Sequence, residues 1–270
     1  MNEMFTRFYN MGSNPFTKGI AAADAHVTED IRQIHARLDH LCRTGGIGLI
    51  TADPGMGKTF AVRSWVAKTN PNTTKAVYLC LSTVTNIDFY RLMSTELGLE
   101  PSFKKAEMYK DIQNCIRSLA EERHVKAVVV IDEAHLLHSS ILRDLQMLTN
   151  FDMDSKDMFA LVLVGHSALA QYLNRQPYES LRQRLVVSYR MGGLDEKATG
   201  DYIRSMLLKV GADPDIFDEA AIASAYSISG GSIRRLNAVL CNALTIGAQN
   251  NLRAIDTEVV RSAAEELSLT

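Results

Sequence analysis

The chain has 270 residues, of which 46% are hydrophobic and 22% charged, a composition typical of soluble globular proteins that excludes a largely disordered chain. Its formal net charge of −2 excludes a global basic field, so any contact with nucleic acid needs a local basic patch. The N-terminal segment carries Glu3 and lacks an unbroken apolar core, and no later apolar run approaches the ~18 residues of a membrane-spanning helix. We therefore expect a soluble, cytoplasmic protein.

The cysteines agree with that expectation. They are far apart in the sequence and form no CxxC pair, which is typical of reduced thiols and argues against a disulfide framework or a zinc site. We interpret them as small buried apolar residues; they are Cys42, Cys80, Cys115 and Cys241.

Apolar runs alternate with amphipathic stretches through the first two thirds of the chain. Near-continuous apolar content predicts strands that are buried on both faces, at 47–51, 76–82, 126–132, 159–165 and 185–189. The stretches between them repeat apolar residues at helical spacing, as in 60–69 and 108–123. This alternation predicts an α/β fold in which a five-stranded parallel sheet carries helices on both faces.

The pattern changes after residues 191–194, "MGGL", where strands cease and helical periodicity continues to the end. Ser232 and Asp256 each stand where a helix N-cap is expected. We therefore predict three parts: an N-terminal arm at 1–25, an α/β domain at 26–190, and a small all-helical domain at 191–270.

A glycine-rich segment, "ADPGMGKTF" at 52–60, follows the first predicted strand and opens a helix. Such a turn directs backbone N–H groups at one point beside a helix N-terminus, which suits a phosphate group. Lys58 would reach the outer phosphates of ATP, and Thr59 would offer its hydroxyl to Mg²⁺. The nucleotide-binding residues predicted here are Asp53, Pro54, Gly55, Met56, Gly57, Lys58, Thr59 and Phe60.

One position departs from the usual phosphate-binding pattern, because Ala52 replaces its first glycine. An alanine fits there only if its φ is negative. The alternative interpretation of the whole segment is a coincidental glycine turn.

Two acidic residues end the predicted strand 126–132, in "VVVIDEAHLL" at 128–137. Asp132 would join Thr59 in holding Mg²⁺, and Glu133 would polarise a water for attack on the γ-phosphate. The alternative is a surface cap on a strand end. His135 and His138 lie three residues apart but have no evident third ligand, so we do not expect a metal site there.

The letters DEAH in this segment also occur in RNA-remodelling helicases. Such helicases need two tandem ATPase cores, whereas this sequence contains one core and a helical region. We therefore expect the charge-neutralising arginine to come from elsewhere, most plausibly from a neighbouring copy of the chain.

Taken together, the motifs resemble the AAA+ ATPases. The segments that carry the resemblance are "ADPGMGKT", "VVVIDEAHLL", "LTNFD", "LVGHSAL", "LRQRL" and "GGSIRRLN", and it extends from "NPF" at 14–16 to about residue 266. Within that family the chain is similar to the group of the secretion ATPase ExeA and the transposon target-selection ATPases TnsC, TniB and MuB. The resemblance implies that 26–190 is an AAA+ P-loop ATPase domain and 191–270 its helical lid domain, with ATP and Mg²⁺ as cofactors.

The resemblance also implies roles for individual residues. His166 matches the sensor of the γ-phosphate, with a plain capping residue as the alternative. Arg184 matches the arginine finger, with Arg182 in reserve, and Arg234 matches the second sensor on the lid. Each arginine taken alone could equally be a solvated surface charge.

Two functions follow from the resemblance. We favour a regulator of DNA transposition that assembles on duplex DNA with ATP as a ring or filament, recruits a transposase, and disassembles when ATP is hydrolysed. The alternative is an ExeA-like ATPase that assists the assembly of secretion machinery. ExeA-like proteins typically continue into a transmembrane segment and a cell-wall-binding region, and the absence of both from a sequence ending at Thr270 favours the first function.

Contact with double-stranded DNA needs a basic patch, and the segment "FKKAEMYK" at 103–110 offers one. Lys104, Lys105 and Lys110 could touch the phosphate backbone without reading bases. An ordinary solvated helix face explains the same residues.

Overall fold

The computed structural model describes residues 2–17, 26–80, 85–152 and 157–267. The chain divides into an α/β unit, formed by 33–53 and 58–191, and a helical unit, formed by the described residues of 1–32, 54–57 and 192–270. Each unit has its own apolar core.

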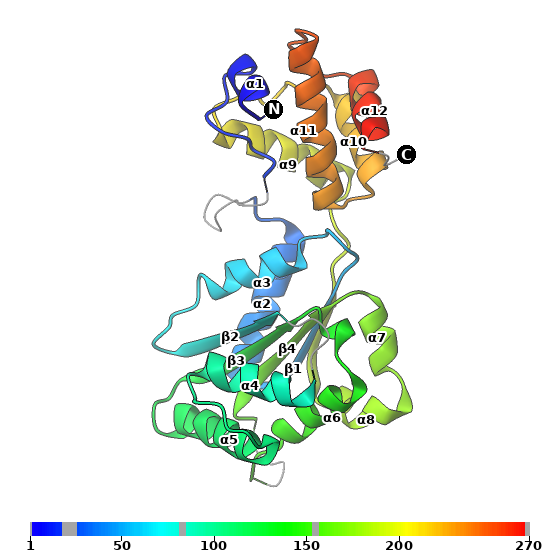
Figure 1. Ribbon diagram of the computed structural model, residues 1–270. Helices are drawn as coiled ribbons and strands as arrows, with labels where there is room; N and C mark the ends of the chain where they lie inside the picture. Colours follow the sequence, from blue (N-terminus) through cyan, green and yellow to red (C-terminus); the bar gives the residue numbers. More distant parts are fainter. Residues whose placement is uncertain (1, 18–25, 81–84, 153–156, 268–270) are drawn as a thin grey trace. The chain divides into compact units, whose positions relative to one another are not determined.

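The α/β unit contains one parallel sheet of five strands in the order β2-β3-β4-β1-β5, with helices on both of its faces (Figure 1). The strands are β1 (Gly46–Thr51), β2 (Thr74–Cys80), β3 (Lys126–Asp132), β4 (Phe159–Gly165) and β5 (Leu185–Arg190). These correspond to the five predicted strands, and the predicted α/β fold with a five-stranded parallel sheet is confirmed. The last two residues predicted for the second strand, 81 and 82, lie outside the described residues.

Burial follows the position of each strand in the sheet. The central strands β1 and β4 are buried along their whole length, which explains their continuous apolar sequence. The edge strands β2 and β5 are only partly buried, so their sequences tolerate lysine and serine. The strand ends that carry the predicted nucleotide residues therefore project from a buried centre.

The helices of the α/β unit connect these strands. They are α3 (Lys58–Val66), α4 (Asn86–Leu97), α5 (Lys105–Glu121), α6 (Ser139–Leu148), α7 (Ala168–Leu173) and α8 (Glu179–Gln183), with short 3₁₀ turns η1 (Ala134–Leu136) and η3 (Gln176–Tyr178). Helix α2 (Glu29–Thr44) leads into β1. Amphipathic helices pack their apolar faces on the sheet, and Phe89, Met93 and Ile112 are fully buried in this way.

The helical unit is formed by α1 (Asn2–Phe8), α9 (Glu196–Lys209), α10 (Glu219–Ser229), α11 (Ile233–Gln249) and α12 (Thr257–Glu266). The predicted caps are present, because Ser232 accepts a hydrogen bond from the Arg235 amide and Asp256 from the Val259 amide.

We expected residues 1–25 to form a separate arm, but the described part of that segment belongs to the helical unit. Phe5, Tyr9 and Phe16 are buried in the core of this unit. The Tyr9 hydroxyl also donates a 2.8 Å hydrogen bond to the Leu252 carbonyl, 243 positions later in the chain. Contacts of this kind fix the N-terminal segment to the C-terminal helices.

The cysteines differ from their sequence-based interpretation. All four are free thiols, but Cys80 is exposed and the other three are only partly buried, so their interpretation as buried apolar residues is wrong.

No helix within the described residues is long and apolar enough to cross a membrane.

Candidate nucleotide site

The phosphate-binding loop begins where β1 ends and finishes where α3 begins at Lys58. Gly55 and Gly57 adopt φ angles of +84° and +97°, which side chains other than glycine rarely accept. Ala52 is fully buried, is not among the residues with positive φ, and donates its amide hydrogen to the Gly165 carbonyl at 3.2 Å. Alanine at this position therefore extends the strand and does not disturb the turn.

Two oxygen groups suited to Mg²⁺ meet at the ends of α3 and β3. The Thr59 hydroxyl donates a 2.7 Å hydrogen bond to Oδ2 of Asp132, which is 2% exposed. A hydroxyl and one carboxylate are the oxygen ligands that Mg²⁺ takes from a protein when the substrate's phosphates supply others. The described residues contain no cluster of three or more His, Cys, Asp or Glu that could hold a metal, and a nucleotide-bound Mg²⁺ needs none. The residues present thus fit the cation that the sequence predicts.

Tyr78 is a contact of Asp132 that the sequence did not predict. Its hydroxyl donates a 2.6 Å hydrogen bond to the same oxygen, Oδ2, that Thr59 reaches. Burial of the tyrosine, followed by its hydrogen bond to Asp132, raises the pKa of Tyr78 well above its ordinary value. The hydroxyl therefore stays protonated and acts as a donor. The contact depends on the parallel pairing of β2 with β3, which places Tyr78 two residues before the partner of Asp132 and which no sequence motif marks.

Glu133 has an unusual backbone. Its φ of 53° and ψ of 33° place it in the left-handed region, and its amide donates to Oδ1 of Asp132 at 2.8 Å. A non-glycine residue in this region carries strain of order 1–3 kcal/mol, which is typical of functional sites. The Glu133 carboxylate is 39% exposed, and its Oε2 lies 3.4 Å from Nδ1 of His135. It is thus positioned beside Asp132 yet accessible to water.

The turn after β4 brings His166 and Ser167 to the phosphate-binding loop at Asp53. The Ser167 hydroxyl donates to Oδ1 of Asp53 at 2.6 Å, and Nε2 of His166 lies 3.8 Å from the same oxygen. The Ala168 amide donates to Nδ1 of His166, so the neutral ring carries its hydrogen on Nε2, the nitrogen that faces Asp53.

The charge of Asp53 is stabilised in this arrangement. The Ser167 hydrogen bond, and next the positive charge of Arg190 among its charged neighbours, lower the pKa of Asp53 below its usual value. The sequence predicted Asp53 in the loop and His166 at the strand end, but not Ser167 as the residue that joins them. No sequence pattern marked that contact.

The two candidate arginine fingers differ in exposure. Arg184 follows α8, is half-buried, and its Nη1 lies 3.5 Å from the Thr149 carbonyl oxygen, to which it donates. Arg182, the reserve candidate, is exposed. Both arginines lie at the end of α8, just before β5.

The third arginine, Arg234, stands in the first turn of α11 and its side chain is exposed. Its amide donates to the carbonyl of Gly55 at 3.1 Å, and both residues belong to the helical unit. A side chain on Gly55 would place its Cβ 2.5 Å from the Ser232 hydroxyl oxygen and 2.9 Å from Cβ of Arg234. Glycine is therefore required at position 55 for both space and conformation.

The predicted DNA-contacting lysines are partly neutralised by acidic neighbours. Nζ of Lys105 lies 2.7 Å from an oxygen of Asp144, and Nζ of Lys104 lies 3.2 Å from an oxygen of Glu107. Lys110 is exposed on α5. These contacts fit the alternative of an ordinary helix surface better than a patch of uncompensated positive charge.

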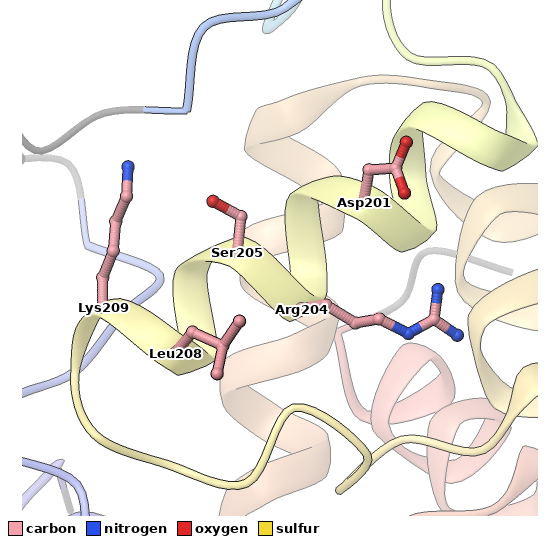
Figure 2. A pocket seen from close by; sticks show the side chains of 5 residues that line it. All are labelled: Asp201, Arg204, Ser205, Leu208 and Lys209. Atoms are coloured by element: carbon pink, nitrogen blue, oxygen red, sulfur yellow. The ribbon is translucent and has the colours of Figure 1, made fainter.

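The helical unit also has a surface hollow of about 500 Å³ beside α9. Figure 2 shows that the labelled side chains around it come from this one helix; they are Asp201, Arg204, Ser205, Leu208 and Lys209. Arg204 is paired with Glu219 and Asp215. None of the predicted site residues lines this hollow.

Comparison with known proteins agrees with this geometry. Residues 40–173 match the AAA domain family, a segment that includes the phosphate-binding loop, the Asp132–Glu133 pair and the turn after β4. These residues are therefore similar to an AAA domain.

One curated relative extends the similarity beyond the AAA domain. General secretion pathway protein A of Aeromonas hydrophila is 28% identical over 252 residues, a match that covers 91% of this chain and 45% of the relative. The chain thus spans less than half the length of this relative. The match supports the ExeA-like part of the resemblance, whereas the similarity to transposition ATPases remains a prediction.

Solved structures share the fold. Cdc6p of Pyrobaculum aerophilum is 19% identical with a TM-score of 0.69, covering 93% of this chain and 70% of its own. A chain from Drosophila ORC bound to DNA is 16% identical with a TM-score of 0.71, covering 98% of this chain and 66% of its own. The RuvB branch migration motor of Thermotoga maritima is 18% identical with a TM-score of 0.57, and the match covers 89% of this chain and 69% of the RuvB chain. At these identities the chain shares their fold, and no activity follows from the likeness.

Proposed function

We propose that this chain hydrolyses ATP to ADP and phosphate and that it acts as an ExeA-like ATPase in the assembly of secretion machinery. The observation that carries the ATPase activity is the hydrogen bond between Thr59 and Asp132, directly beside Glu133. The observation that favours secretion is the similarity to a general secretion pathway protein over 91% of the chain.

Binding of ATP follows from the phosphate-binding loop. Gly55 and Gly57 allow the loop backbone to turn its amides toward phosphate oxygens, and Lys58 at the start of α3 adds a positive charge. Thr59 and Asp132 would hold Mg²⁺, which supplies charge neutralisation for the phosphates when bound. Tyr78 keeps the Asp132 carboxylate oriented toward Thr59 through its own hydrogen bond.

Hydrolysis requires an oriented water, and Glu133 is the residue for this task. Its carboxylate is accessible and stands one residue after the Mg²⁺ ligand Asp132. His166 would sense the γ-phosphate from the turn after β4, and Arg234 would do so from α11. Arg184, with Arg182 in reserve, would act on the nucleotide of a neighbouring copy in an oligomer.

A coupled cycle follows from these roles. ATP held by Lys58 of one copy and approached by Arg184 of the next would stabilise the interface between them. Loss of the γ-phosphate would remove the negative charge that both residues share, so the interface would loosen. Hydrolysis would thus time the lifetime of an assembly.

A second candidate function is the transposition regulator, which binds duplex DNA without reading its sequence and recruits a transposase. The motif resemblance to TnsC, TniB and MuB favours it, and the fold is shared with an ORC chain whose structure was solved on DNA. Lys104, Lys105 and Lys110 are its candidate contacts, although two of them already pair with acidic residues.

One experiment tests the ATPase and separates the two functions. Phosphate release would be measured for the natural sequence and for Lys58→Ala, beside duplex DNA binding by fluorescence anisotropy with ATP, ADP or no nucleotide. Turnover that depends on Lys58, without DNA binding in any nucleotide state, supports the ExeA-like function. Strong ATP-dependent binding to unrelated DNA sequences would favour the transposition regulator, and turnover unchanged in Lys58→Ala would overturn the proposed site.

A further inference from the structure

His135 contacts the candidate water-orienting residue and the turn after β4 through a single ring atom. Its Nδ1 lies 3.4 Å from Oε2 of Glu133 and accepts the backbone amide hydrogen of His166 at 3.3 Å. The sequence pattern suggested His135 only as a metal ligand and gave it no role. In the structure it lies where the end of β3 meets the end of β4.

The packing around His135 is close enough to hold the ring in place. A Cβ on Gly165, the last residue of β4, would lie 3.3 Å from the His135 amide nitrogen and 3.4 Å from its Nδ1. The His135 and His166 rings also stand with their centroids 6.0 Å apart. The ring therefore lies between Glu133 and the turn that carries His166.

One nitrogen cannot accept and donate a hydrogen bond at the same time. With the ring hydrogen on Nε2, Nδ1 accepts from the His166 amide. With the hydrogen on Nδ1, the ring would carry its donor toward Oε2 of Glu133, 3.4 Å away, and the His166 amide would lose this acceptor. The orientation of Glu133 and the position of the His166 turn are thus connected through the state of one side chain.

We propose that His135 is a positioning residue for Glu133 and that the turn after β4 competes with the carboxylate for its Nδ1. This inference rests on the proposed ATPase activity and adds a residue to it. Glu133 occupies a strained backbone conformation, so its carboxylate has no regular secondary structure to orient it. His135 supplies the contact that the backbone lacks, and misplacement of a catalytic group by about 1 Å costs up to about a hundredfold in rate.

The test compares three substitutions of His135. Alanine removes the contact, leucine fills similar space without polar atoms, and glutamine can accept from the His166 amide and donate to Glu133. We expect kcat to fall about tenfold or more in His135→Ala and His135→Leu. The KM for ATP and the affinity for a non-hydrolysable ATP analogue should stay within about twofold, and His135→Gln should recover most of the activity.

His40→Ala is the matched control, because His40 is an exposed histidine on α2. If His135 acted through packing alone, His135→Leu would preserve kcat and His135→Gln would be no more active than His135→Leu. That result would overturn the proposal. Equal losses in kcat and in nucleotide affinity would also overturn it.

Glu133→Gln distinguishes this proposal from the proposed function. If the natural sequence does not hydrolyse ATP, or if Glu133→Gln does not abolish its turnover, the ATPase assignment fails. If turnover depends on Glu133 but is unchanged in His135→Ala, only the role of His135 fails. The ¹⁵N signals of the His135 ring must also shift in Glu133→Gln, with or without turnover, and unmoved signals would contradict the contact itself.

Discussion

The hydroxyl of Tyr78 on β2 donates a 2.6 Å hydrogen bond to Oδ2 of Asp132 at the end of β3. Asp132 therefore accepts at one oxygen from both Tyr78 and Thr59, and at the other from the Glu133 amide. A carboxylate held by three donors cannot rotate freely. The proposed Mg²⁺ ligand is thus oriented before any nucleotide binds.

Tyr78→Phe should test that orientation. Loss of the hydroxyl removes one hydrogen bond to a charged group, which typically contributes about 1.5–3 kcal/mol, and the partial exposure of Tyr78 reduces the expected loss in the free energy of unfolding to about 1 kcal/mol. We also expect a higher Mg²⁺ concentration for half-maximal ATP turnover. Chemical denaturation and a Mg²⁺ titration measure the two effects. Tyr226→Phe on α10 is the control, and equal behaviour of the two variants would contradict the role of Tyr78.

Glu133→Gln should separate ATP binding from hydrolysis. Glutamine keeps the shape of the side chain but cannot take a proton from water, so kcat should fall by about a hundredfold or more while ATP affinity is retained. If hydrolysis times disassembly, oligomers formed with ATP should also last longer, as followed by light scattering. Glu96→Gln, at an exposed position on α4, is the control. Rapid disassembly of Glu133→Gln in ATP would contradict the timing role.

Gly55→Ala should damage the phosphate-binding loop through backbone strain and through close contacts of the added Cβ. Gly211→Ala introduces only the backbone strain, so comparing the two variants separates the effects. Both glycines have positive φ, which costs about 1–2 kcal/mol for alanine, but only Gly55 has atoms within 4 Å of the added Cβ. Gly55→Ala should therefore lose more stability in chemical denaturation than Gly211→Ala, and it should also lose ATP affinity. Equal losses in the two variants would mean that the contact with α11 contributes nothing.

Ser167→Ala should raise the pKa of Asp53 toward its usual value of 3.8, because the hydroxyl is the main cause of the lowered pKa. A pKa lowered by folding means that ionised Asp53 stabilises the folded protein above its unfolded pKa. That contribution is lost as the pH falls through the lower folded pKa. Carboxyl ¹³C shifts of Asp53 across an acid titration measure the change. An unchanged titration in Ser167→Ala would show that Ser167 does not control this carboxylate.

Arg184→Ala should lower turnover without lowering the affinity of the isolated chain for ATP, because its proposed role is on a neighbouring copy. Arg182→Ala, which changes the exposed arginine two residues earlier, is the matched comparison. Turnover per chain should rise with protein concentration in the natural sequence, because the arginine would act across an interface. In Arg184→Ala that rise should disappear. A loss of monomer affinity equal to the loss of turnover would mark Arg184 as structural, as its contact with the Thr149 carbonyl allows.

The sequence predicted features that arise from local pattern. Continuous apolar runs located the five strands, and glycine spacing located the loop before Lys58. Contacts between side chains from distant segments were not predictable in this way. Tyr78 and Ser167 carry no motif, and their roles depend on the order in which β2, β3, β4 and β1 lie in the sheet. The pairing of Lys105 with Asp144, 39 residues later, was hidden for the same reason.

The burial of Phe5 and Tyr9 among α11 and α12 residues has a consequence for synthesis of the chain on the ribosome. Phe5 and Ala264 belong to one apolar cluster, although most of the sequence separates them. Phe5 and Tyr9 are translated well before these partners, and such a non-local core cannot form until the partners are made. The α/β unit can complete its sheet once β5 has emerged, whereas the apolar side chains of α1 stay exposed to chaperones until α11 and α12 follow.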